Sequence, residues 1–81
     1  MITDVSEDAK AVLRVVTKEA ADGYTVQSRT GMDRDRLSAA LRDLLRESFV
    51  QVEGDLNPEN VGRAYIWVPP GRSGYARIAS V

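Results

Sequence analysis

The sequence predicts a small α+β domain in which three helices are followed by a two-stranded β-hairpin. Apolar residues recur every three or four positions along two segments in the first half of the 81 residues, which is typical of amphipathic helices. β-branched and aromatic residues gather in two short runs of the second half, which is typical of strands. We expect residues 1–70 to form the domain and residues 71–81 to be a C-terminal tail, either flexible or added to the sheet as an edge strand.

The first helix is predicted over residues 5–21. Asp4 is suited to accept hydrogen bonds from the first N–H groups of this helix, and Glu7, three positions later, completes a capping box. Gly23 is the predicted stop signal. The apolar stripe of this helix consists of Val5, Ala9, Val12, Leu13, Val16 and Ala20.

A short second helix is predicted to end at Thr30, because Gly31 tolerates the positive φ that often follows a helix. The sequence leaves the start of this helix open. Thr25 is one candidate for the N-cap, and Asp22, which lies three residues earlier, is the other.

The third helix is predicted over residues 34–47, with Asp33 as its N-cap. It has the strongest helical periodicity in the chain, and its apolar residues are Leu37, Ala40, Leu41, Leu44 and Leu45. We therefore expect Leu37, Leu41 and Leu44 to face the core.

The hairpin is predicted over residues 49–68. Its two strands are the runs that contain Phe49, Val50 and Val52 and, after the turn-forming segment GDLNPENVG, residues 64–68. The aromatic residues Tyr24, Tyr65 and Trp67 are expected to pack the hairpin onto the helices rather than to stack on the bases of a single strand.

The segment from Thr30 to Val52, TGMDRDRLSAALRDLLRESFVQV, resembles the winged helix-turn-helix domains of bacterial transcriptional regulators. The residues that carry the resemblance are Thr30, Gly31, Met32, Asp33, Leu37, Ser38, Ala40, Leu41, Arg42, Phe49 and Val50. Two features depart from the pattern: the second helix is short, and Ser48 stands where such families usually have glycine. The resemblance implies a small winged helix-turn-helix fold, with the 49–68 hairpin as the wing, and binding of double-stranded DNA in transcriptional regulation.

Charge is distributed unevenly along the chain. The net charge is −2 over residues 1–28, +2 over residues 29–46 and −1 over residues 47–81. Positive charge is therefore concentrated around the third helix, although the whole chain has a net charge of −1 and a pI of about 5.3, which is unusual for a nucleic-acid-binding domain.

The predicted DNA-binding face is centred on helix 34–47, because the second helix of a helix-turn-helix motif enters the major groove. We expect Arg34 and Arg42 to contact guanine, while Ser38 and Ala39 are small enough to allow close approach. Asp35 would repel phosphate unless it accepts a hydrogen bond from cytosine. The full set is Arg29, Thr30, Arg34, Asp35, Arg36, Ser38, Ala39, Arg42, Arg46 and Arg63, of which Arg29, Arg36, Arg46 and Arg63 are the expected phosphate ligands.

A simpler interpretation of the same arginines is a solvated helix face held by local ion pairs, such as Arg36 with Asp43 or Asp35 with Arg42. The acidic pI favours a second functional class as well, in which the domain is a protein-interaction or assembly module that does not bind DNA.

The chain has no histidine and no cysteine, and its serines and carboxylates form no recognisable catalytic or metal-binding pattern. We therefore expect no enzymatic activity, no metal and no cofactor. The expected partners are double-stranded DNA and a second copy of the chain in a homodimer, because one small domain makes few DNA contacts. No segment is long and apolar enough to span a membrane, and a cytoplasmic location is expected.

Overall fold

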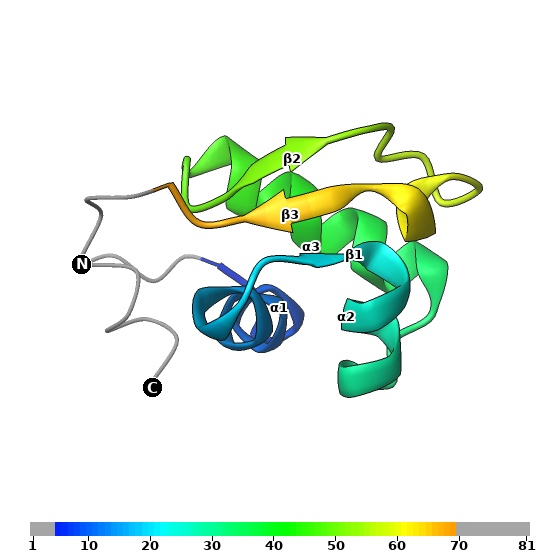
Figure 1. The fold of residues 1–81 in the computed structure, drawn as a ribbon, viewed down its shortest axis with the longest axis horizontal. Helices are drawn as coiled ribbons and strands as arrows, with labels where there is room; N and C mark the ends of the chain where they lie inside the picture. Colours follow the sequence, from blue (N-terminus) through cyan, green and yellow to red (C-terminus); the bar gives the residue numbers. More distant parts are fainter. Residues whose placement is uncertain (1–4, 70–81) are drawn as a thin grey trace.

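The computed structural model describes residues 5–69, which form an α+β fold of three α-helices and a three-stranded antiparallel sheet (Figure 1). The elements in chain order are α1 (Glu7–Lys18), β1 (Ala21–Asp22), α2 (Gly23–Thr30), α3 (Arg34–Arg46), β2 (Gln51–Glu53), the 3₁₀ turn η1 (Val61–Arg63) and β3 (Tyr65–Trp67). The predicted class and the order of the helices are confirmed. The predicted tail over residues 71–81 lies outside the described residues.

Helix α1 is shorter than the predicted helix over residues 5–21. Its N-cap is Ser6, whose hydroxyl accepts a hydrogen bond of 3.1 Å from the backbone N–H of Ala9. Glu19 caps the other end in an extended conformation. The predicted capping role of Asp4 is therefore wrong, and Gly23 starts α2 instead of stopping α1.

Asp22 is the N-cap of α2, because its carboxylate accepts a hydrogen bond of 2.8 Å from the backbone N–H of Thr25. This settles the alternative that the sequence left open. Gly31 follows the helix with a φ of 78°, as predicted, and a three-residue turn leads to α3. Asp33 caps α3 as expected, through a hydrogen bond of 2.8 Å from the backbone N–H of Arg36.

The sheet has the order β1-β3-β2 (Figure 1). Ile66 in the central strand is opposite both Ala21 and Val52, and Tyr65 is opposite both Asp22 and Glu53. The prediction of a two-stranded hairpin is therefore incomplete, because the chain between α1 and α2 contributes a third strand.

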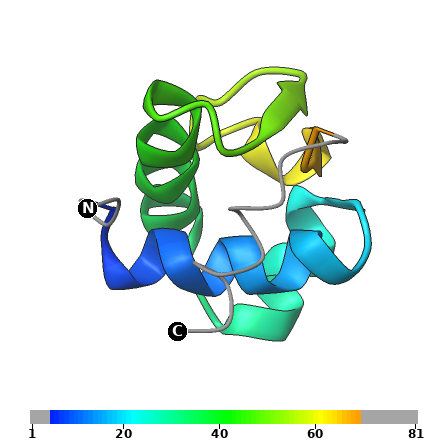
Figure 2. The ribbon, with the colours of Figure 1, turned by 90° about the vertical axis from the view of Figure 1, so that its left-hand side faces the viewer.

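The core lies where α1, α3 and the inner face of the sheet meet. Helix α3 runs across α1 rather than alongside it, as Figure 2 shows. The side chains of Leu13, Leu37, Leu41, Leu44 and Ile66 are fully buried there, so the predicted inward face of α3 is confirmed. The prediction that the tyrosines belong to the core is wrong, because Tyr24 is 59% exposed and Tyr65 is 46% exposed.

The N-terminus of α2 packs tightly against η1. A Cβ atom added to Gly23 would clash with the carbonyl oxygen of Val61 and lie 2.8 Å from the Cα of Gly62. Glycine at residue 23 therefore allows the close approach that fixes the end of the segment between β2 and β3 onto α2.

Candidate nucleic-acid interface

The solvent-facing side of α3 is a stripe formed by Asp35, Ala39, Arg42 and Arg46. These residues are exposed and lie at spacings of four, three and four, so they follow one side of the helix. Arg34, at the first position of α3, is also exposed, but it lies about 100° around the helix from Asp35, on the side of Ser38. We call these five residues the α3 face. It contains three arginines and one carboxylate, and its centre is the small side chain of Ala39.

The arginines of the α3 face differ in their partners. Arg46 pairs with Asp43 at 2.9 Å and lies 3.8 Å from a carboxylate oxygen of Glu47. Within residues 5–69, Arg34 and Arg42 form no ion pair. Two guanidinium groups are thus available to an external anion, whereas the charge of Arg46 is balanced locally.

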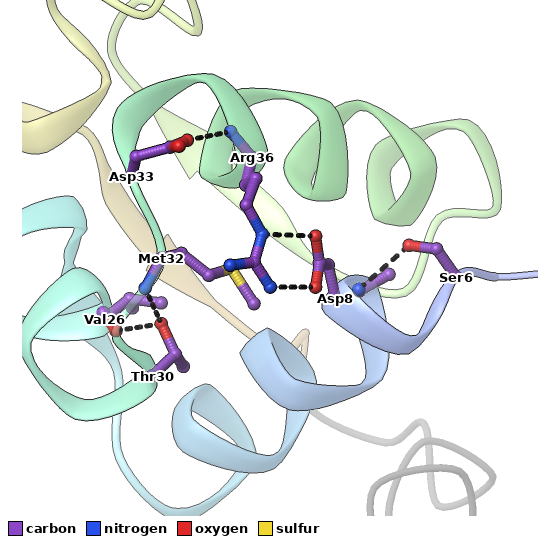
Figure 3. Close-up of polar contacts among 8 residues, drawn as sticks. Ser6, Asp8, Val26, Thr30, Met32, Asp33 and Arg36 are labelled. Atoms are coloured by element: carbon purple, nitrogen blue, oxygen red, sulfur yellow. Dashed lines mark hydrogen bonds and ion pairs between the residues drawn. The ribbon is translucent and has the colours of Figure 1, made fainter.

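Arg36 does not belong to the α3 face. Its guanidinium donates hydrogen bonds of 3.0 and 2.8 Å to the two carboxylate oxygens of Asp8 in α1 (Figure 3). The hydrogen bond from Arg36 lowers the pKa of Asp8, and the same contact raises the pKa of Arg36. Arg36 therefore joins α3 to α1, and its predicted role as a phosphate ligand is not supported by its position.

Thr30 has a structural role in the turn between α2 and α3. Its hydroxyl donates a hydrogen bond of 2.7 Å to the carbonyl oxygen of Val26 and accepts one of 3.3 Å from the backbone N–H of Met32 (Figure 3). Met32 is buried, so this contact fixes an apolar side chain of the turn in the core. Both polar functions of Thr30 are used within the protein.

Ser38 was predicted to face the groove, and the structure contradicts this prediction. Its side chain is buried, and its hydroxyl donates a hydrogen bond of 2.6 Å to the carbonyl oxygen of Leu56. The segment between β2 and η1 therefore covers one flank of α3. Ser38 holds this segment in place and is not accessible to a base.

The segment over residues 54–60 has its own polar network. The carboxylate of Asp55 accepts hydrogen bonds from the backbone N–H of Asn57 at 3.0 Å and from the side-chain amide of Asn60 at 2.9 Å. The hydrogen bond from the Asn57 backbone lowers the pKa of Asp55 most, and the positive charge of Arg42 adds to this effect. Asp55 is thus a fixed negative charge beside the α3 face.

Arg29 and Arg63 lie apart from the α3 face. Arg29 lines an open pocket together with residues of α1, β1 and β3, and no residue of α3 contributes to that pocket. Arg63 is exposed at the end of η1 and forms no ion pair with a described residue. Of the ten predicted site residues, Asp35, Ala39, Arg42 and Arg46 therefore share one side of α3, and Arg34 is exposed at the first position of the same helix.

One exposed aromatic residue of the sheet, Tyr65, lies outside the predicted site. The alternation of exposed Tyr65 with buried Ile66 is the sequence signal for one solvent-facing side of this strand.

Residues 5–69 contain no cluster of three or more potential metal ligands. Over the same residues, every helix is too short or too polar to cross a bilayer.

Comparison of the chain with protein-family models, with curated proteins and with solved structures gives no match.

Proposed function

We propose that this chain is a winged helix-turn-helix domain that binds double-stranded DNA, with α3 in the major groove and the hairpin of β2 and β3 as the wing, and that it acts in transcriptional regulation. The observation that carries the proposal is the α3 face, where Arg42 beside the small Ala39, and Arg34 at the first position of the helix, are exposed and form no ion pair with a described residue. In helix-turn-helix proteins the corresponding helix presents its side chains to base edges.

The connection between α2 and α3 supports the proposal. A short turn that contains glycine is typical of the helix-turn-helix motif, and here Gly31 begins a turn of three residues. Both helices of the motif start at an aspartate whose side chain caps the backbone. The turn is further fixed by Thr30, so α3 is presented on a rigid support.

Contacts from the α3 face would be of two kinds. A guanidinium group can make a bidentate contact to guanine in the major groove, which contributes about 1 to 3 kcal/mol of discrimination for each correct pair. Arg34 at the N-terminus of α3 and Arg42 on its exposed side are the residues that we propose for such contacts. Asp35 would favour cytosine at its position, because a carboxylate accepts a hydrogen bond from the cytosine amino group.

The proposal is tested by titrating the protein into labelled duplex DNA at two salt concentrations. Replacement of Arg34 and Arg42 by alanine should abolish binding while the far-ultraviolet circular dichroism and the melting temperature remain unchanged. Replacement of Arg14 and Lys18, which are exposed on α1, removes the same charge and serves as the control. Equal affinity of the wild type and the Arg34/Arg42 variant would contradict the assignment.

A second candidate function is a protein-interaction or assembly module. The specific observation in its favour is the charge of the proposed wing, where Glu53, Asp55 and Glu59 are exposed and Arg63 is the only basic residue of residues 51–67. A wing of this composition repels phosphate. Lack of duplex binding at low salt would favour this second function over the first.

A further inference from the structure

The outer face of the sheet carries an exposed tyrosine between two carboxylates. Tyr65 in the central strand is directly opposite Asp22 in β1 and Glu53 in β2. Residues directly opposite each other in an antiparallel sheet point to the same side, so these three side chains form one row. Tyr65 is 46% exposed, whereas in the neighbouring row Ile66 is buried and its partners Ala21 and Val52 are half-buried.

Trp67 extends this row along β3. It lies two residues after Tyr65 and therefore on the same side of the strand, with a distance of 5.8 Å between the ring centroids and an angle of 38° between the ring planes. Gln51 is its partner across the strand pair. Two aromatic rings, the exposed Tyr65 and the half-buried Trp67, thus lie side by side on the outer side of the sheet, and the strand on either side of Tyr65 contributes a carboxylate.

Tyr65 also lines an open pocket of about 280 Å³ between α1, β1 and α2. This volume is at the lower limit for pockets that bind small molecules, so it suits one long side chain better than a whole ligand. The charged residues that line the pocket are Glu19, Asp22 and Arg29. Together with Glu53 they give this side of the molecule three carboxylates and one guanidinium group.

We propose that this aromatic–acidic face, made of Glu19, Asp22, Glu53, Tyr65 and Trp67, binds an arginine- or lysine-bearing segment of a partner protein. The faces of tyrosine and tryptophan rings attract cations, and the flanking carboxylates add to this attraction. The same carboxylates repel phosphate, which argues against a nucleic acid as the occupant. The face is formed by the sheet and the pocket and contains no residue of α3, so the proposal does not depend on DNA binding.

The test uses the full chain and a capped peptide in which three arginines are spaced by glycine and serine, with a matched peptide that contains glutamate in place of arginine. Trp67 is the only tryptophan, so its fluorescence reports directly on the face. We expect a saturable change in emission with the arginine peptide at about 1 mM or below. The glutamate peptide should produce none.

Variants assign the binding to the proposed residues. Tyr65→Ala and Glu53→Gln should each lower the affinity for the arginine peptide about two- to fivefold. This is the effect expected from loss of one exposed cation–π contact or one exposed ion pair. Glu59→Gln removes the same charge from the segment between β2 and η1 and should leave the affinity unchanged. Equal weakening by Glu53→Gln and Glu59→Gln would show attraction by net charge alone and would overturn the proposal. The lack of a saturable fluorescence response to the arginine peptide would also overturn the proposal. So would a dimer, detected by sedimentation, that Tyr65→Ala dissociates, because the face would then be covered by a second copy of the chain.

Discussion

Ser38→Ala tests whether the segment between β2 and η1 is held against α3. The hydroxyl of Ser38 is buried on the flank of α3 and donates a hydrogen bond of 2.6 Å to the carbonyl oxygen of Leu56, 18 residues away. No other hydrogen bond joins a side chain of α3 to residues 54–60 within the described part of the chain. The substitution removes this link and leaves the apolar packing of the helix intact.

The magnitude follows from three contributions. Loss of the hydrogen bond costs about 1 kcal/mol, and more if the carbonyl oxygen of Leu56 finds no other donor. Leu56 is half-buried, so water can replace part of the lost contact. Alanine in place of serine improves helix propensity by about 0.5 kcal/mol. The net expectation is a free energy of unfolding lower by about 0.5 to 1.5 kcal/mol, which corresponds to a decrease in Tm of about 2 to 12 °C for a domain of this size.

Thermal unfolding followed by circular dichroism measures the change in Tm, and amide hydrogen exchange measures the protection of residues 54–60. The matched control is Ala39→Ser at the next position, which is exposed and should lower the free energy of unfolding by about 0.5 kcal/mol through helix propensity alone, without changing the exchange of residues 54–60. An unchanged Tm together with unchanged exchange in the 54–60 segment would refute the reasoning. An equal loss of protection over residues 54–60 in Ala39→Ser would do so as well, because it would show an effect of the helix alone.

Three further predictions concern the core, the contact between α2 and η1, and the response to acid. Leu41→Ala should lower the free energy of unfolding by about 2 to 5 kcal/mol in urea titration, because Leu41 is fully buried; an unaltered midpoint would contradict its place in the core. Gly23→Ala should lower the free energy of unfolding in the same titration by about 1 to 3 kcal/mol or more, because its Cβ would meet the backbone of Val61. An unchanged free energy of unfolding would show that the backbones of α2 and η1 can move apart to accommodate the Cβ. The pKa of Asp8 lies below its ordinary value of 3.8, so its stabilising contact with Arg36 is present above that pH and is lost as the pH falls through the lowered pKa. Asp8→Asn should therefore show a smaller loss of Tm than the wild type between neutral pH and pH values below 3.8, and equal losses would contradict the contribution of this pair.

The sequence predicts α3 well because several local signals agree. Asp33 supplies the cap, and the spacing of Leu37, Leu41 and Leu44 defines the buried side without any knowledge of what packs against it. Strand β1 could not be predicted in the same way. It has two residues, too few to show an alternating pattern, and it exists because Ala21 and Asp22 pair with β3, which lies more than 40 residues later.

The candidate site is predictable only in part for a related reason. The helical period places Ser38 at the edge of the polar side of α3, but the segment that covers it comes from a different part of the chain. Arg36 was paired in the sequence analysis with Asp43 on its own helix, whereas its partner is Asp8, 28 residues away. Both contacts depend on how α3 crosses its neighbours, which local periodicity does not encode. Arg34 and Arg42 are exposed, as the helical period predicts, and neither forms an ion pair with a residue of the described range 5–69.

The most direct test of the proposed function is the salt dependence of duplex binding by the wild type and by the Arg34/Arg42 double-alanine variant. Each phosphate or base contact that releases a counterion contributes about −0.9 to the slope of log K against log salt, so two arginines account for roughly a tenfold loss of affinity between about 50 and 200 mM salt. We expect steep salt dependence for the wild type, a slope shallower by about two units or no measurable binding for the Arg34/Arg42 variant, and the wild-type slope for the Arg14/Lys18 control. No binding of duplex DNA by the wild type at the lower salt concentration would contradict the proposed function.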